Sequence, residues 1–249
     1  AVSLLSKIFR MEPSELFNQI NGLYEISVTS DNWIIQHAFL IALTTLSSEN
    51  KYNCIEDLYK RSTNFIVQCA QSEIDRLSES AVYTLEMIAR NYNMYSNETG
   101  ITQMLELIKI LLNRNASICS RSLKLLQKIV SHKNAPVDKL FDDLIEVSSA
   151  ALGRKDFKSK EIFATVFTTF RSIIGNCTKD SIENIKNFLK NSIVNYLKDV
   201  LNEMQSQEIT HMMEQSIFQT IITIFKRYSE YLRDEGIEVI SLLFIIFSE

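Results

Sequence analysis

The sequence predicts an all-α fold, a right-handed α-α superhelix of about five to six helical hairpins. Five segments carry a triplet with i, i+4, i+7 spacing, which forms one stripe on an α-helix, and successive triplets begin 42, 41, 41 and 54 residues apart. Only 5 glycines and 2 prolines occur among 249 residues, which favours long helices with short turns. The triplets are Phe39/Leu43/Leu46, Ala81/Leu85/Ile88, Ser122/Leu126/Ile129, Phe163/Phe167/Phe170 and Ile217/Ile221/Ile224.

The apolar periodicity and the turn residues together set the expected helices in chain order. Pro13 and Pro136 each fall at a first helical position, where a missing N–H breaks no hydrogen bond. Gly153, Gly175 and Gly236 fall between periodic segments, where helix stops and turns are expected. The expected helices cover residues 3–10, 13–28, 33–48, 53–71, 79–93, 100–113, 117–132, 137–152, 159–174, 180–200, 208–230 and 236–247.

Consecutive helices pair into hairpins, and the second helix of each hairpin carries the stripe. A period near 41 residues is typical of units that bury their apolar faces only by stacking on their neighbours. The last interval is longer, because a long first helix and the polar linker "NEMQSQEIT" precede the fifth stripe. The hairpins are expected at about 13–48, 53–93, 100–132, 137–174 and 180–230.

Three of the stripe segments resemble second helices of HEAT and armadillo repeats: "SDNWIIQHAFLIALTTL", "LSESAVYTLEMIAR" and "ASICSRSLKLLQKIV". The resemblance extends over most of the chain, although the proline common in the first helix of HEAT units is missing. It implies a non-enzymatic protein-interaction scaffold within a larger eukaryotic assembly. We expect residues 1–249 to form one solenoid domain. The apolar run Leu242–Phe247 before the last residue suggests a fragment of a longer protein, or a cap packed on the preceding helix.

The composition indicates a folded protein without a membrane-spanning segment, in a reducing compartment. Hydrophobic residues make up 46% of the chain, which excludes disorder, and no apolar run reaches the 18 or so residues that span a bilayer. The four cysteines are scattered, so we expect a reducing compartment, the cytoplasm or the nucleus, and no membrane partner.

No local motif indicates catalysis. The three histidines, His37, His132 and His211, have no second ligand at metal spacing, and neither a glycine-rich phosphate loop nor a G-x-S-x-G turn occurs. We therefore expect no enzyme activity, no catalytic residues, no cofactor and no metal.

The charge distribution supplies the candidate site. The net charge is −4, yet residues 109–160 hold 11 Lys and Arg against 5 Asp and Glu. If the turns between helices share one edge of the array, this segment forms a basic ridge with the single tryptophan nearby. The candidate partner-binding residues are Trp33, Arg114, Arg121, Lys124, Lys128, Arg154, Lys155, Lys158 and Lys160.

Three interpretations of this ridge stay open. It is a solvated basic face, or it binds a protein partner with an acidic surface, or segment 109–160 contacts a nucleic-acid backbone. The net charge and the scarcity of aromatic residues between the basic positions argue against nucleic acid.

A tryptophan beside basic turns is similar to the arrangement in TOG domains, HEAT arrays that bind tubulin. That resemblance implies a cytoskeletal role, with Trp33 in the first turn, Arg114 and Arg121 in the third, and the residues from Arg154 to Lys160 in the fourth. The sequence departs from the TOG pattern after the tryptophan, where Ile34, Ile35 and Gln36 stand instead of Lys and Arg, and in the fifth turn, which has no basic residue.

Overall fold

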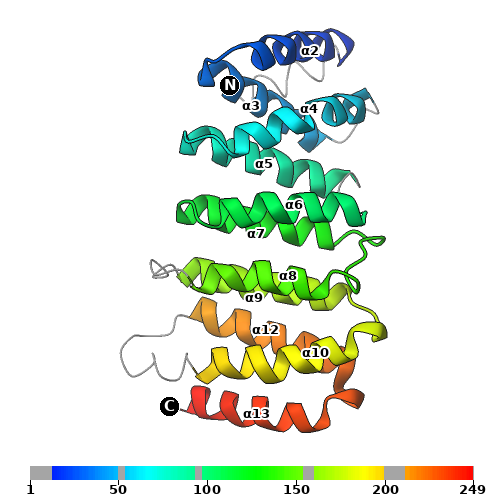
Figure 1. Cartoon of the computed structure of the whole chain (residues 1–249), viewed down its shortest axis with the longest axis vertical. Coiled ribbons are helices and arrows are strands. Elements are labelled where there is room, and N and C mark those ends of the chain that lie inside the picture. Colours follow the sequence, from blue (N-terminus) through cyan, green and yellow to red (C-terminus); the bar gives the residue numbers. More distant parts are fainter. Residues whose placement is uncertain (1–12, 50–53, 93–96, 154–159, 199–210, 249) are drawn as a thin grey trace. The chain divides into compact units, whose positions relative to one another are not determined.

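The computed structural model describes residues 13–49, 54–92, 97–153, 160–198 and 211–248. Throughout these ranges the chain is helical or in turns, with no strand, so the all-α prediction is confirmed. The chain divides into two compact units, residues 1–135 and 136–249, which are drawn from blue to green and from green to red in Figure 1. In the described ranges no helix combines the length and the apolar character needed to cross a membrane.

The described residues of the first unit form three helical hairpins. Its helices are α2 (Pro13–Thr29), α3 (Trp33–Glu49), α4 (Cys54–Ala70), α5 (Asp75–Asn91), α6 (Glu98–Leu111) and α7 (Ala116–Val130). The second helices of the hairpins, α3, α5 and α7, pack side by side as one layer, and α4 and α6 pack against α5 and α7 (Figure 1). The layer of α3, α5 and α7 is called the second-helix layer below.

The second unit repeats this plan less regularly. Its elements are α8 (Phe141–Ala150), a 3-10 turn (Ala151–Gly153), α9 (Lys160–Asn176), a 3-10 turn (Lys179–Ser181), α10 (Ile182–Phe188), a π-helical turn (Leu189–Ile193), α12 (His211–Tyr228), a 3-10 turn (Ser229–Tyr231) and α13 (Arg233–Ser248). Helices α9 and α12 pack side by side and carry the fourth and fifth stripes, and α13 packs against the π-helical turn.

Burial confirms the repeated stripe. Every residue of the five triplets is buried, and the most exposed of them, Phe163, shows 6% of its surface. The polar member, Ser122, is buried without cost because its hydroxyl donates to the carbonyl of Ile118 one turn earlier. The period therefore arises because each second helix turns the same face toward the core of its unit.

Side-chain hydrogen bonds repeat with the same period. Near the end of α5, Asn91 donates to the carbonyl of Ser47 on α3, and beyond α7 the ring of His132 meets the carbonyl of Ala89 on α5. In the second unit, Thr220 of α12 donates to the carbonyl of Phe167 on α9 at 2.8 Å. These contacts fix the alignment of neighbouring second helices, which apolar contact alone specifies weakly.

Several expected boundaries are wrong. Helix α5 begins at Asp75, four residues before the expected start at 79. A turn precedes it, in which the Ser72 hydroxyl accepts from the Ile74 amide, and the Ile74 carbonyl accepts from the Leu77 and Ser78 amides. Helix α8 begins at Phe141 rather than at 137. Asp138 instead accepts hydrogen bonds from the Thr178 amide and the Ser181 hydroxyl, which holds residues 136–140 in a turn.

Three further expectations, in the second unit and at the N-terminus, need comment. The continuous helix expected at 180–200 is interrupted by 3-10 and π-helical turns. Gly236, expected at a helix stop, lies in the first turn of α13, where an added Cβ would approach the ring of Phe225 to 2.7 Å. The helix expected at 3–10 lies outside the described residues.

The buried cysteines provide a first test of the fold. Cys69, Cys119 and Cys177 are buried and form no disulfide, and burial raises the pKa of the Cys69 thiol to about 11 and that of Cys177 to about 12. Because only the thiolate reacts, we expect almost no reaction with Ellman's reagent at pH 8 in a Cys54→Ser variant, and reaction of all three thiols after denaturation. Stoichiometric reaction of the native protein within minutes would contradict this packing.

Candidate functional site in the second-helix layer

The structure brings together the residues of the predicted basic ridge between Arg114 and Lys128. The rest of the ridge is not described. Arg114 precedes α7, and Arg121, Lys124 and Lys128 lie on α7, all in the first unit. Arg154, Lys155 and Lys158 fall outside the described residues, and Lys160 is the first residue of α9, with no described side-chain environment. The candidate site is therefore built from the first unit alone.

Trp33 begins α3 and is half-buried. The Asn32 side chain just before it accepts from the Ile34 amide at 3.0 Å, which caps the helix start. The Trp33 ring lies 6.1 Å from the ring of His37, one turn along. Burial, together with the positive charge of Arg76, lowers the pKa of His37, which favours the neutral form of its imidazole.

Arg114 holds the start of α7 to the start of α5. Its guanidinium donates to the Asp75 carboxylate at 2.8 Å and to the carbonyl of Glu73 at 3.2 Å. This hydrogen bond lowers the pKa of Asp75. Arg114, predicted as part of a binding ridge, is therefore already paired with residues at the start of α5.

Arg121 is engaged with α5 in three ways. Its Nε lies 3.3 Å from the Glu79 carboxylate, its Nη1 lies 3.8 Å from Oε2 of Glu86, and its guanidinium lies 4.5 Å over the ring of Tyr83. The stacked geometry suits a planar guanidinium and would not be reproduced by lysine. Arg121 therefore connects α7 to the exposed face of α5.

Glu86 is the centre of a basic cluster. Burial raises the pKa of its carboxyl, while the charges of Arg121, Lys128, Lys124 and Arg90 lower it. Its Oε2 atom is buried without a hydrogen bond, because the 3.8 Å to Arg121 is too long for one. The four cations, Arg90, Arg121, Lys124 and Lys128, are called the basic cluster below. They outnumber the two neighbouring carboxylates, Glu79 and Glu86.

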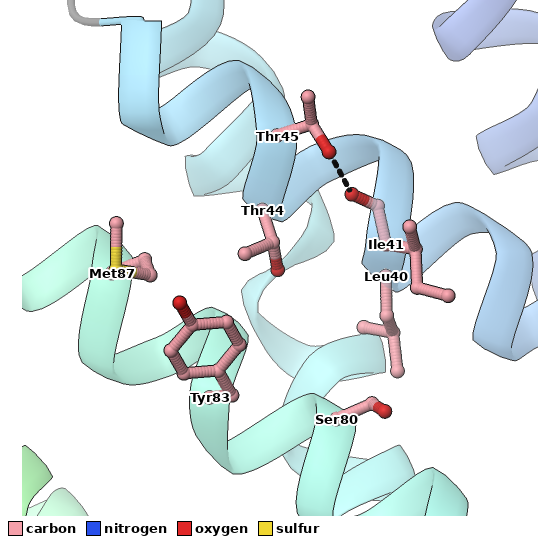
Figure 2. Close-up of a pocket in the computed structure, with 7 residues that line it drawn as sticks. All are labelled: Leu40, Ile41, Thr44, Thr45, Ser80, Tyr83 and Met87. Atoms are coloured by element: carbon pink, nitrogen blue, oxygen red, sulfur yellow. Dashed lines mark hydrogen bonds between the residues drawn. The ribbon is translucent and has the colours of Figure 1, made fainter. Parts of the chain in front are cut away.

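An apolar pocket lies next to the basic cluster. It has a volume of about 360 Å³ and opens between α3 and α5 (Figure 2). Tyr83, 38% exposed, is both part of its wall and the ring beneath Arg121, so the pocket and the cluster are continuous. The lining residues are Leu40, Ile41, Thr44, Thr45, Ser80, Tyr83 and Met87.

Tyr83, Glu86 and the pocket were not predicted from the sequence. A signal was present: in "LSESAVYTLEMIAR", positions 83, 86, 87 and 90 form a second stripe of i, i+3, i+4, i+7 spacing beside the buried one. Within the described ranges, no three or more His, Cys, Asp or Glu side chains gather as a metal site would require.

Replacing Glu86 by glutamine should flatten the pH dependence of stability. Because the folded-state pKa of Glu86 is raised above its ordinary value near 4.5, the folded protein binds more protons than the unfolded chain just above that pH. The free energy of unfolding therefore falls as the pH rises through this window. Urea unfolding of wild type and Glu86→Gln from pH 4.5 to 7 should show curves that diverge with pH, and parallel curves would contradict this assignment.

Neither a protein-family model nor a curated protein sequence matches the chain. Solved structures do. An importin beta crystal structure matches with a TM-score of 0.79 at 14% identity, over 92% of this chain and 29% of that chain. Kap95p in a nuclear-import complex with RanGDP matches with a TM-score of 0.76, and Kap95 bound to Nup1 with 0.74. Both are 11% identical over 92% of this chain and 28% of theirs.

These likenesses show the fold. The chain has a HEAT/armadillo-type helical-repeat fold, as the stripes predicted, and it spans less than a third of the length of the structures it matches.

Proposed function

We propose that the chain is a non-enzymatic protein-interaction scaffold within a larger eukaryotic assembly, and that the second-helix layer is its partner-binding face. The observation that carries the proposal is the apolar pocket joined through Tyr83 and Arg121 to the basic cluster. The solved structures with this fold include complexes with Ran and with Nup1, which supports partner binding as the use of the fold. The site favours a partner with an acidic surface, in the cytoplasm or the nucleus.

Site-specific photocrosslinking tests this proposal. A photoreactive amino acid placed at Ile41 in the pocket wall is compared with one placed at Lys60, which lies on α4 and is paired with Glu56. We expect a discrete crosslinked partner at Ile41 and not at Lys60, and a purified sample of that partner should bind the wild-type chain in calorimetry. Equal crosslinking at both positions, or binding unaffected by Tyr83→Asp, would refute the proposal.

A second candidate is a segment of a nuclear transport receptor. The observation that favours it is the match to importin beta and Kap95 over 92% of the chain. Titration of the chain with purified RanGDP and with Nup1 tests it directly. Absence of binding to both would remove this candidate while leaving the scaffold proposal in place.

The tubulin and nucleic-acid interpretations have less support, because Arg114 and Arg121 are already paired with carboxylates of α5. Size-exclusion chromatography with tubulin, comparing wild type with Trp33→Ala plus Lys155→Glu, distinguishes the TOG-like role. Nucleic-acid binding would show a steep loss of affinity with salt.

A further inference from the structure

The exposed face of the second-helix layer changes in character from one helix to the next. Positions one repeat apart on this face are Ile41, Tyr83 and Lys124. One turn later, Thr45 and Met87 are buried in the lining of the pocket, and Lys128 on α7 is half-buried. Until Glu49 at its end, α3 has no Asp, Glu, Lys or Arg. The face therefore runs from Ile41 on α3, through the aromatic ring of Tyr83 on α5, to the lysines of α7.

The pocket at one end of this gradient and the cations at the other suit different chemical groups of a partner. The pocket between α3 and α5 suits one large apolar side chain, since Leu40, Ile41, Tyr83 and Met87 make up most of its lining and the remaining three residues carry only hydroxyl groups. Arg90 and the three cations of α7 outnumber the carboxylates of Glu79 and Glu86, so the net charge of this neighbourhood is positive. This net charge attracts an acidic group of a partner.

We propose that the second-helix layer binds an extended acidic segment of a partner protein, anchored by one large apolar side chain in the pocket and crossing α5 so that its carboxylates lie against the basic cluster. This rests on the proposed scaffold function and adds the chemistry of the partner. Neighbouring helices lie about 8–10 Å apart, and an extended chain advances about 3.3 Å per residue. The acidic residues are therefore expected about three to five positions from the anchor.

Fluorescence anisotropy with a defined peptide tests the proposal. The probe is a labelled 12-residue peptide with one Phe followed, from the fourth position after it, by four Asp and Glu residues. Matched probes replace the Phe by Gly, the acidic residues by Ser, or the acidic residues by Lys. We expect only the complete acidic probe to bind well, with affinity falling as salt increases.

Matched protein variants locate the binding face. Lys124→Glu plus Lys128→Glu changes the charge as much as Lys60→Glu plus Lys109→Glu, whose lysines lie on α4 and α6 and pair with Glu56 and Glu106. We expect the first pair to raise the Kd about tenfold or more, because each substitution replaces an attraction for the carboxylates of the probe by a repulsion. The second pair should leave it nearly unchanged. Ile41→Asp should weaken the Phe probe and leave the Gly probe unaffected.

The outcomes separate this inference from the proposed function. Circular dichroism melting of each variant shows whether it is folded, and Ile41→Ser replaces Ile41→Asp if the latter is not. Equal losses for the two lysine pairs, tighter binding of the Lys probe, no binding of any probe, or stronger competition by a single-stranded oligonucleotide would each overturn the inference. If the protein crosslinked at Ile41 binds the layer through a segment without acidic residues, this inference fails while the scaffold function stands.

Discussion

Replacing Phe167 by alanine will lower the free energy of unfolding by about 3–5 kcal/mol, the range observed for buried aromatic residues cut back to alanine. Phe167 is fully buried in the fourth stripe, and its ring lies 4.7 Å from that of Phe163 and 5.6 Å from that of Phe170. Neighbouring helices close such a cavity only in part, because the Thr220 hydroxyl is hydrogen-bonded to the Phe167 carbonyl and fixes α12 against α9.

Urea unfolding followed by circular dichroism measures this loss. Hydrogen exchange should accelerate in α9 and α12, because each helix of a repeat array depends mainly on its neighbours. Phe244→Ala, at a position 75% exposed on α13, is the control and should cost less than about 1 kcal/mol. A similar loss for the two variants would show that the stripe is not the core of the second unit.

Replacing Tyr59 by alanine should be comparably severe in the first unit, again about 3–5 kcal/mol. Tyr59 is fully buried on α4, its ring lies 4.9 Å from that of Tyr92, and its hydroxyl is 2.5 Å from that of Ser47 on α3. Burial raises the pKa of the phenol, so the group stays neutral in alkaline solution. Tyr59 thus connects α4 to α3 and to Tyr92, the residue that follows α5.

The Tyr59→Phe variant separates the contribution of the ring to stability from that of the hydroxyl. It keeps the packing and removes the hydrogen bond with Ser47, while the Ser47 hydroxyl still donates to the Leu43 carbonyl, so we expect a loss of only about 1 kcal/mol. Chemical denaturation of the two variants under the same conditions gives the comparison. If Tyr59→Phe costs as much as Tyr59→Ala, the hydrogen bond and not the ring holds this region together.

The periodic core was predictable because its signal is local. The spacing of Leu85 and Ile88 on one face of a helix follows from the helical repeat, and 41 residues between stripes leaves room for one more helix. The interruptions were not predictable from periodicity. Asp138 holds residues 136–140 out of a helix through contacts with Thr178 and Ser181, about 40 residues away.

The candidate site was also predictable only in part from the sequence. The sequence revealed that Arg121, Lys124 and Lys128 share a helix face and that segment 109–137 lacks acidic residues. It did not reveal that Glu79 and Glu86, one repeat earlier, lie against those cations, because ion pairing between helices depends on how they are aligned.

By itself, the sequence determined the helical class, the repeat length and the buried stripes of this protein, because all three follow from residue spacing along a single helix. Only the tertiary structure decided which basic residues are paired, that Tyr83 lies between a pocket and a guanidinium, and that the second-helix layer grades from apolar to basic. Those features arise between helices, where distances of a few ångströms set the electrostatic and packing energies.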